Sequence, residues 1–249
     1  MTDLLAVTAV LLLLLLADRW LHRHLQGVMY LLSGDEEVAL WLYALILFPG
    51  VLLHELSHAL MAALLGVRIG RISVLPKRVG DHIHLGFVPV EETDFVRSSL
   101  IGAAPLLSGT AAILLIGIHL FGTPTLVAAM EAGRWAEAAE ALRGAFHAPD
   151  AWLWFYLIFA IGHTMLPSRA DIHAWPFLGA LLLAAMGIVV AAGAGAALFE
   201  GVRALMTALA AWMVLLGGSL LLADLPLFSF LAALEWLLGR LTGKEIRYG

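Results

Sequence analysis

The stretch His54-Glu55-Leu56-Ser57-His58 lies inside an apolar run from Val38 to Val67. A helix brings residues i and i+4 onto one face, so both imidazoles can reach one metal ion. Glu55 sits beside them, and its carboxylate can take a proton from water activated by the metal. Ionisable side chains are costly in hydrocarbon and mark functional sites in membrane proteins. The stretch therefore predicts a membrane helix that carries a metal-dependent hydrolytic site.

The composition is typical of a membrane protein. Of the 249 residues, 62% are hydrophobic and 13% are charged, whereas a soluble domain is about half apolar and about a quarter charged. The apolar residues are gathered in long blocks, which is the pattern of membrane spans. The sequence has no cysteine, which excludes thiolate catalysis and cysteine–zinc sites. The net charge of -5 argues against nucleic-acid binding.

The apolar blocks predict an all-α polytopic membrane protein with about six transmembrane helices in a single membrane domain, residues 1–249. The block from Leu4 to Ala17 is interpreted as a retained span and not a signal peptide, because Asp3 precedes it and no basic residue does. A short polar loop at 18–37 is expected to end in a cap and an acidic first turn for the next helix. The later spans are expected at 38–67, 98–121, 151–166, 175–199 and 204–223. An amphipathic connector is expected at 123–150 and an interfacial tail at 225–249.

Residues 68–94 have a different pattern, with loosely alternating apolar residues on either side of a turn-like Lys77-Arg78-Val79-Gly80-Asp81. This pattern predicts a small β-hairpin directly after the metal-binding helix. Its edge is a predicted place for an unwound substrate segment to pair as a strand. Four residues form this predicted edge: Ile72, Val74, His82 and His84.

A catalytic zinc usually has three protein ligands, so the two histidines need a third. With six spans, the second and fourth helices run in the same direction. The stretch from the start of the fourth span to Asp171 is about 30 Å long at about 1.5 Å per residue, which is the depth of His58. Asp171 is therefore the predicted third ligand, ahead of Asp81 and Asp150, with His173 as its alternative.

Together these features resemble the site-2 protease family of intramembrane zinc metallopeptidases. Four features carry the resemblance: the His-Glu-x-x-His motif, the hairpin after it, the small residues from Gly102 to Gly109, and the segment from Pro167 to Asp171. They cover residues 38–175, the expected catalytic core. The resemblance implies one Zn2+ per chain, with His54, His58 and Asp171 as ligands and Glu55 as the catalytic acid/base.

The late segment departs from the family's pattern, which reads N-x-x-P, then aspartate five residues after the proline, then glycine. Here Thr164 stands at the asparagine position, Asp171 follows Pro167 by four residues, and Ile172 replaces the glycine. His163 and Thr164 are candidates to donate a hydrogen bond in the transition state or to orient a metal ligand.

The predicted function is hydrolysis of peptide bonds in membrane-spanning protein substrates, as in regulated intramembrane proteolysis. One alternative is a prenyl-protein-type membrane peptidase, which would use a later glutamate such as Glu200 as third ligand. Another is a non-catalytic or transport-type zinc-binding membrane protein, which should carry polar ligands on several spans.

The basic residues orient the predicted spans. Of the 14 lysine and arginine residues, nine fall on the side of the hairpin and five on the other side. Counting 225–241 as a seventh span would change the ratio to six against eight, so the count favours six. Positive charge marks the cytoplasmic side. Both termini, the hairpin and the active-site opening are therefore predicted in the cytoplasm, in a prokaryotic cell membrane.

Overall fold

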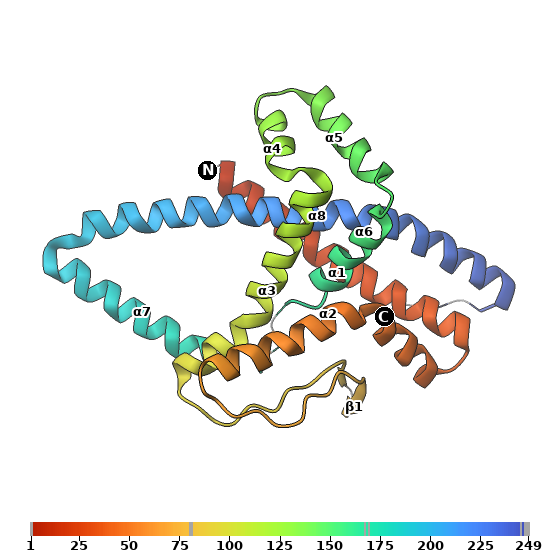
Figure 1. The fold of residues 1–249 in the computed structure, drawn as a ribbon, viewed down its shortest axis with the longest axis horizontal. Helices are drawn as coiled ribbons and strands as arrows, with labels where there is room; N and C mark the ends of the chain where they lie inside the picture. The colour runs from red at the N-terminus through yellow and green to blue at the C-terminus, as the bar shows by residue number, and fades with distance from the viewer. Residues whose placement is uncertain (1, 80–81, 167, 169, 245, 247–249) are drawn as a thin grey trace.

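The computed structural model describes residues 2–79, 82–166, 168, 170–244 and 246, and nearly all of its regular structure is helical (Figure 1). The elements follow one another as α1 (Thr2–Ser33), α2 (Glu36–Leu64), β1 (Lys77–Val79), β2 (His82–His84), α3 (Phe95–Phe121), α4 (Thr123–Glu131), α5 (Trp135–His147), α6 (Ala151–Gly162), α7 (Trp175–Val189), η1 (Val190–Ala194) and α8 (Gly195–Thr242).

Three helical stretches among the described residues are long and apolar enough to cross a membrane: Glu36–Leu64, Phe95–His119 and Trp175–Thr242. The chain therefore has the character of a membrane protein. Helix α6 has 12 residues and is about 18 Å long at about 1.5 Å per residue. The hydrocarbon core is about 30 Å thick, so the helix at the predicted fourth span is too short to cross it.

Helix α1 does not end where the sequence predicted a loop. It continues through residues 18–33, and its face toward the body buries Leu21, Leu25 and Val28. Asp18 and His22 are only partly exposed, so the polar run belongs to a packed seam. The predicted cap comes after it, because the Asp35 carboxylate accepts hydrogen bonds from the first backbone N–H groups of α2 at 2.8 and 2.9 Å.

The segment between α2 and α3 folds back on itself. Strand β1 pairs with β2 in antiparallel register, with Lys77 opposite His84. Two isolated bridges, Ile69 with Val90 and Ser73 with Phe87, continue the pairing toward the membrane helices. The rest of the segment is irregular. The side chains of His82 and His84, which the sequence placed at the substrate edge, lie outside the described residues.

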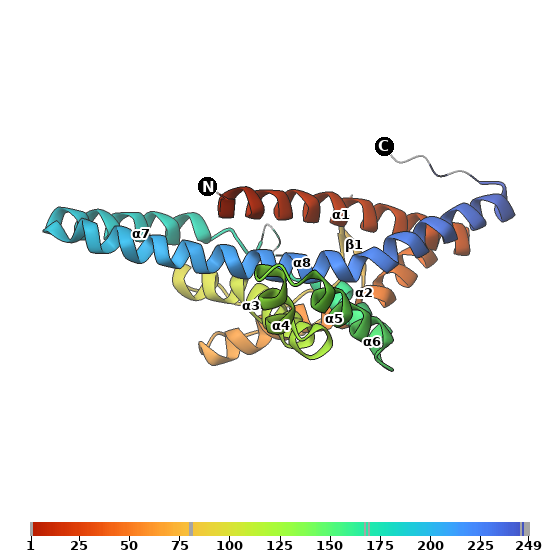
Figure 2. The same cartoon turned by 90° about the horizontal axis from the view of Figure 1, so that it is seen from above.

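Helices α7 and α8 form an arm that projects from the body (Figures 1 and 2). The chain reverses within η1, where Gly193 has φ +82°, a conformation that glycine adopts without strain. The predicted reversal at 200–203 is therefore wrong. The predicted break after residue 223 is also wrong, since α8 runs through Pro226. Buried residues on both sides of this proline, Ala223 and Leu231, anchor the helix to the body.

Helix α6 lies between the two main groups of buried side chains. Phe155 and Ile158 pack with residues of α3, α5 and α8. Phe159 and Ala160 pack with residues of α1 and α2. The connector at 123–150 consists of α4 and α5, which also pack against the first group. The end of α6 is thus held from both sides, and this fixes the position of the residues that follow it.

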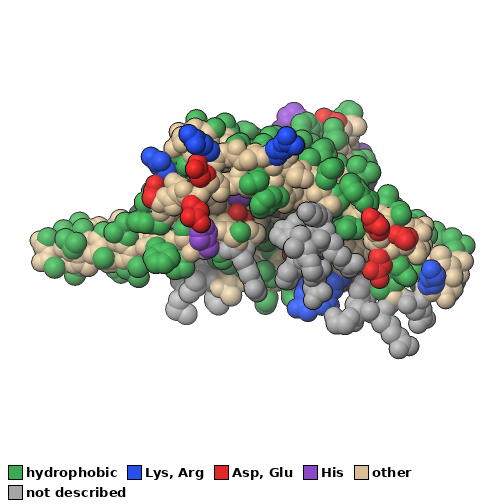
Figure 3. Space-filling view, turned by 90° about the horizontal axis from the view of Figure 1, so that it is seen from below, with side chains coloured by type: hydrophobic (Ala, Val, Ile, Leu, Met, Phe, Trp, Pro, Cys, Tyr) green, Lys and Arg blue, Asp and Glu red, His purple; other side chains and the backbone are tan. Residues whose placement is uncertain are grey.

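The arm differs from the body in burial. Helix α7 has no buried residue among those described, although its sequence is almost wholly apolar. On the face shown in Figure 3, the tapering arm carries hydrophobic side chains, and the charged side chains gather on the body. Such an apolar surface is expected where lipid takes the place of water.

Candidate metal centre

One face of α2 carries Gly50, His54 and His58 at intervals of four residues. This spacing stacks the two imidazoles one above the other. Their Nε2 atoms lie 3.2 Å apart, so both rings present the same nitrogen to a common point. The helix predicted from the apolar run is therefore present, and it aligns the two histidines as expected.

Asp171 reaches the same point from the segment between α6 and α7. Its Oδ1 lies 3.2 Å from Nε2 of His58, and its Oδ2 lies 3.9 Å from Nε2 of His54. One ligand atom from each of the three residues falls within 4.8 Å of the others. We refer to His54, His58 and Asp171 as the first cluster. It contains the three residues that the sequence selected as metal ligands.

The other acidic and histidine candidates are placed elsewhere. Asp150 accepts a hydrogen bond from the indole of Trp154 at 2.5 Å. His173 is exposed, and its Nδ1 donates to the Ala170 carbonyl at 2.6 Å. Asp81 lies outside the described residues.

The outer nitrogens of both histidines are bonded to main-chain carbonyls. Nδ1–H of His54 donates to the Thr164 carbonyl at 2.7 Å, and Nδ1–H of His58 donates to the Ile101 carbonyl at 2.9 Å. These bonds fix the tautomer in which Nε2 carries the lone pair, as in metal-ligating histidines generally. Two imidazoles and one carboxylate with an open fourth position are the donor set of a catalytic zinc, so the residues fit such an ion.

Two glycines allow close backbone contacts at the first cluster: Gly50 lets α6 approach α2, and Gly102 lets the segment that carries Asp171 approach α3. A Cβ on Gly50 would lie 2.0 Å from the Ala160 carbonyl oxygen, and a Cβ on Gly102 would lie 2.0 Å from that of Asp171. A larger residue at position 50 would push α6 away from α2, and a larger residue at position 102 would push the Asp171 segment away from α3. Among the small residues of α3 noted in the sequence from Gly102 to Gly109, Gly102 therefore makes room for the backbone of the candidate ligand Asp171.

Glu55 is 7% exposed and lies beneath the segment that follows β2. A Cβ on Gly86 would lie 2.5 Å from Oε1 of Glu55. The irregular limb that contains Gly86 thus covers the glutamate carboxylate. Ile72 and Val74, on the opposite limb, flank the bridge between Ser73 and Phe87.

Asp171 is held in its charged form. Burial alone would raise the pKa of this carboxyl group, but the nearby His58 imidazole and the hydrogen bonds from Ser168 outweigh it and hold the pKa below its usual value. Its Oδ2 accepts from the Ser168 backbone N–H at 2.6 Å. A deprotonated carboxylate is the form that coordinates a metal ion.

Thr164 orients a candidate ligand, one of its two predicted roles, but does so through its main chain, whereas His163 lies outside the first cluster. The Thr164 hydroxyl donates to the Ala160 carbonyl one turn back, and its contact with the first cluster is made by its own carbonyl. Both ring nitrogens of His163 contact carboxylates outside the first cluster, Asp18 at 2.7 Å and Asp224 at 3.2 Å. His163 therefore belongs to another group of polar side chains.

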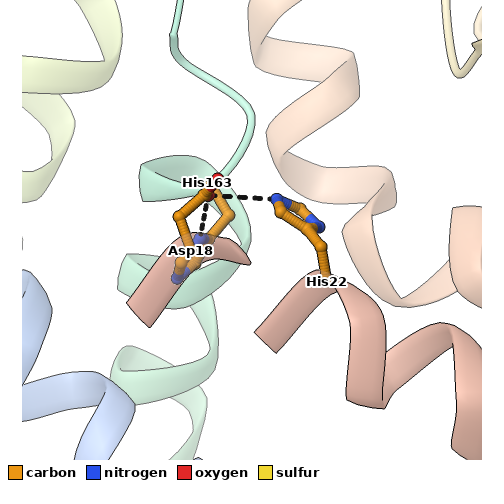
Figure 4. Close-up of side chains that lie close together, drawn as sticks. All are labelled: Asp18, His22 and His163. Carbon is orange, nitrogen blue, oxygen red and sulfur yellow. Dashed lines mark hydrogen bonds and ion pairs between the residues drawn. The ribbon is translucent and has the colours of Figure 1, made fainter. Parts of the chain in front are cut away.

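We refer to Asp18, His22 and His163 as the second cluster, in which three ligand atoms again lie within 4.8 Å of one another. Figure 4 shows Asp18 and His22 extending from α1 to meet His163 at the end of α6. Sequence reasoning missed Asp18 and His22, because residues 18–37 were interpreted as a loop, and missed Asp224, because it was placed between a span and the interfacial tail. The available signal was the i, i+4 spacing of Asp18 and His22, the same spacing as in the first cluster.

Comparisons of this chain with protein-family models, with curated proteins and with solved structures give no match.

Proposed function

We propose that the chain is an intramembrane zinc metalloendopeptidase that hydrolyses peptide bonds in membrane-spanning protein substrates. One observation carries the proposal: His54, His58 and Asp171 converge within coordination distance of a single ion, with Glu55 next to the first ligand on the same helix. The resemblance to the site-2 protease family supports the same assignment.

The chemistry follows from the residues of the site. A zinc ion held by the first cluster would lower the pKa of water and polarise the scissile carbonyl. Glu55 takes the proton of the attacking water and delivers it to the leaving amine. Burial of Glu55 beneath the Gly86 segment keeps bulk water away from this proton transfer.

The substrate is a membrane helix that unwinds locally, because a helical peptide hides its peptide bonds in its own hydrogen bonds. The segment 71–90 supports this because Gly86, which lies within it, is in contact with the Glu55 carboxyl group. An extended substrate strand pairs with this segment through main-chain hydrogen bonds. We place the opening on the cytoplasmic side of a prokaryotic membrane, because five basic residues lie between the end of α2 and the first turn of α3: Arg68, Arg71, Lys77, Arg78 and Arg97.

The test compares the wild-type chain with Glu55→Gln in cleavage of a panel of single-span substrates. We expect cleavage to fall about 10²–10⁴-fold, the contribution of general acid–base catalysis, while bound zinc is unchanged. Glu37→Gln is the matched control, since Glu37 is exposed in the first turn of the same helix. Equal cleavage by the wild-type and Glu55→Gln proteins would refute the peptidase assignment.

The prenyl-protein-type alternative has less support. Glu200 is exposed and its carboxylate accepts from Arg203 at 2.9 Å. Asp171 occupies the position that this alternative reserves for a glutamate.

The transport-type alternative is favoured by one observation, the presence of the second cluster on other helices. Zinc uptake into proteoliposomes separates it from the peptidase. A transporter takes up zinc both as the wild-type chain and as Glu55→Gln. The peptidase takes up no zinc in either form, and its Glu55→Gln variant loses cleavage.

A further inference from the structure

We propose that the second cluster is a binding site for a second divalent transition-metal ion. Oδ1 of Asp18 lies 3.1 Å from Nε2 of His22 and 2.7 Å from Nδ1 of His163. The two imidazoles and the carboxylate therefore face one point, as Figure 4 shows. This inference does not rest on the proposed function, because it concerns different residues on different elements.

The outer nitrogens of both histidines have partners of their own. Nε2–H of His163 donates to Oδ1 of Asp224 at 3.2 Å. Nδ1 of His22 is 2.7 Å from the Tyr43 hydroxyl, so in the metal-bound state Nδ1–H donates to that oxygen. Metal-ligating histidines almost always have such an outer hydrogen bond, often to a carboxylate, which fixes the ring and leaves the inner nitrogen for the metal.

The charge of this region also favours a divalent ion. Asp18 and Asp224 bring two carboxylates to one imidazole ring, and Asp224 is 0% exposed. Within the described part of the chain, Oδ2 of Asp224 has no hydrogen-bond partner. A divalent cation held by Asp18, His22 and His163 would offset both of these negative charges. Buried charge without compensation is strongly unfavourable.

The donor set and its accessibility define the kind of ion. Imidazole and carboxylate ligands suit zinc and its first-row neighbours, while calcium and magnesium prefer all-oxygen sites. The side chains of Asp18 and His22 are 30% and 25% exposed, so an ion can reach them. Once bound, it ties α1 to the end of α6.

The experiment counts the zinc ions bound by the full-length chain in detergent. The protein is stripped with a chelator, titrated with Zn2+ alone, and measured by elemental analysis. We expect two ions per wild-type chain, one per His54→Ala/His58→Ala chain and one per His22→Ala/His163→Ala chain. His119→Ala is the control and should bind two, because His119 is an exposed residue of α3 outside both clusters.

The outcomes separate the two sites. One ion in the wild type that is lost with His54→Ala/His58→Ala overturns the second site and leaves a hydrogen-bonded network only. One ion that is lost only with His22→Ala/His163→Ala supports the second site and overturns the first. No bound ion overturns both.

A milder variant covers the case in which removal of both histidines prevents folding. Tyr43→Phe keeps the ring and removes the oxygen that orients His22. We expect the second ion to bind about 10–100-fold more weakly, as for loss of an outer-shell partner, with the first ion unaffected. Unchanged affinity would overturn the assignment of His22 as a ligand.

Discussion

The first and second clusters each contain two histidines and one aspartate, but a different pair of these residues lies on the shared helix. In the first, α2 supplies two histidines four residues apart and a loop supplies the aspartate. In the second, α1 supplies an aspartate and a histidine four residues apart, and the end of α6 supplies the other histidine. The outer nitrogens of the first pair bond to main-chain carbonyls. Those of the second contact side chains, Tyr43 and Asp224.

The residue next to a ligand distinguishes the two clusters further. His54 is followed by Glu55, whereas His22 is followed by Arg23. A carboxylate beside the metal can accept a proton, and a guanidinium cannot, because arginine stays protonated. The comparison teaches that a ligand set alone does not make a catalytic site. In the proposed function Glu55 is the base beside the first cluster, whereas neither sequence neighbour of His22 is a base. The further carboxylate at the second cluster, Asp224, is hydrogen-bonded to His163.

The largest effect is expected from Asp171→Ala. Loss of a ligand should weaken zinc binding at the first cluster by more than the ~10–100-fold that loss of an outer-shell partner costs, and cleavage should fall with it. His173→Ala is the matched control, because that residue is exposed and its Nδ1 donates to the Ala170 carbonyl within its own turn. Zinc titration and substrate cleavage measure the result. If His173→Ala has the larger effect, the third ligand has been assigned wrongly.

Gly86→Ala tests the proposed role of Glu55 as a base without changing any of the candidate metal ligands. The new methyl group would lie 2.5 Å from the Glu55 carboxylate and displace it. We expect cleavage to fall about 100-fold, a cost typical of misplacing a reacting group by about 1 Å, with two zinc ions still bound. Gly144→Ala, with open space at its Cβ position, is the control for steady-state kinetics. Normal cleavage by Gly86→Ala would show that this segment does not cover Glu55 during turnover.

Gly102→Ala should have a smaller effect, confined to the first cluster. Its methyl group would meet the Asp171 carbonyl oxygen at 2.0 Å and shift the ligand's backbone. Zinc affinity at the first cluster should fall on the order of 10-fold, the lower end of outer-shell effects, without change at the second. Gly179→Ala has no neighbour within 4 Å and serves as the control. An equal loss at both clusters would mean that the whole fold had been disturbed.

The smallest effect is expected from Thr164→Val. The variant removes a hydroxyl that bonds within its own turn and keeps the carbonyl that orients His54. Thermal unfolding should show that the free energy of unfolding falls by about 0.5–1.5 kcal/mol, the net contribution of one hydrogen bond. Zinc affinity at the first cluster should stay within 10-fold of wild type. A larger loss would indicate that the hydroxyl, not the carbonyl, supports the ligand.

The sequence predicted the parts of the fold that depend on local pattern. The apolar run at 38–67 and the expected cap within residues 33–37 predict α2, and the structure identifies Asp35 as its N-cap. The turn at Gly193 and the continuity of α8 through Pro226 were not predicted. Both depend on context: a glycine within an apolar run carries no signal of reversal, and a proline can stay within a helix that is anchored on both sides.

The pair His54 and His58 could be predicted because its motif is local, whereas the helix-length estimate that selects Asp171 treats the fourth span as continuous helix. The structure brings Asp171 to the same point although α6 ends at Gly162. The second cluster could not be predicted, because its members lie far apart in the chain. His163 meets Asp18 across 145 positions of sequence and Asp224 across 61. Only the packing of α1 and α8 against α6 brings them together.

Two consecutive residues serve the two clusters, since the His163 side chain contacts the second and the Thr164 carbonyl holds His54 in the first. If both clusters bind ions, a displacement of this one peptide unit would alter both sites at once, and any coupling between the two ion affinities would be reciprocal by thermodynamic linkage.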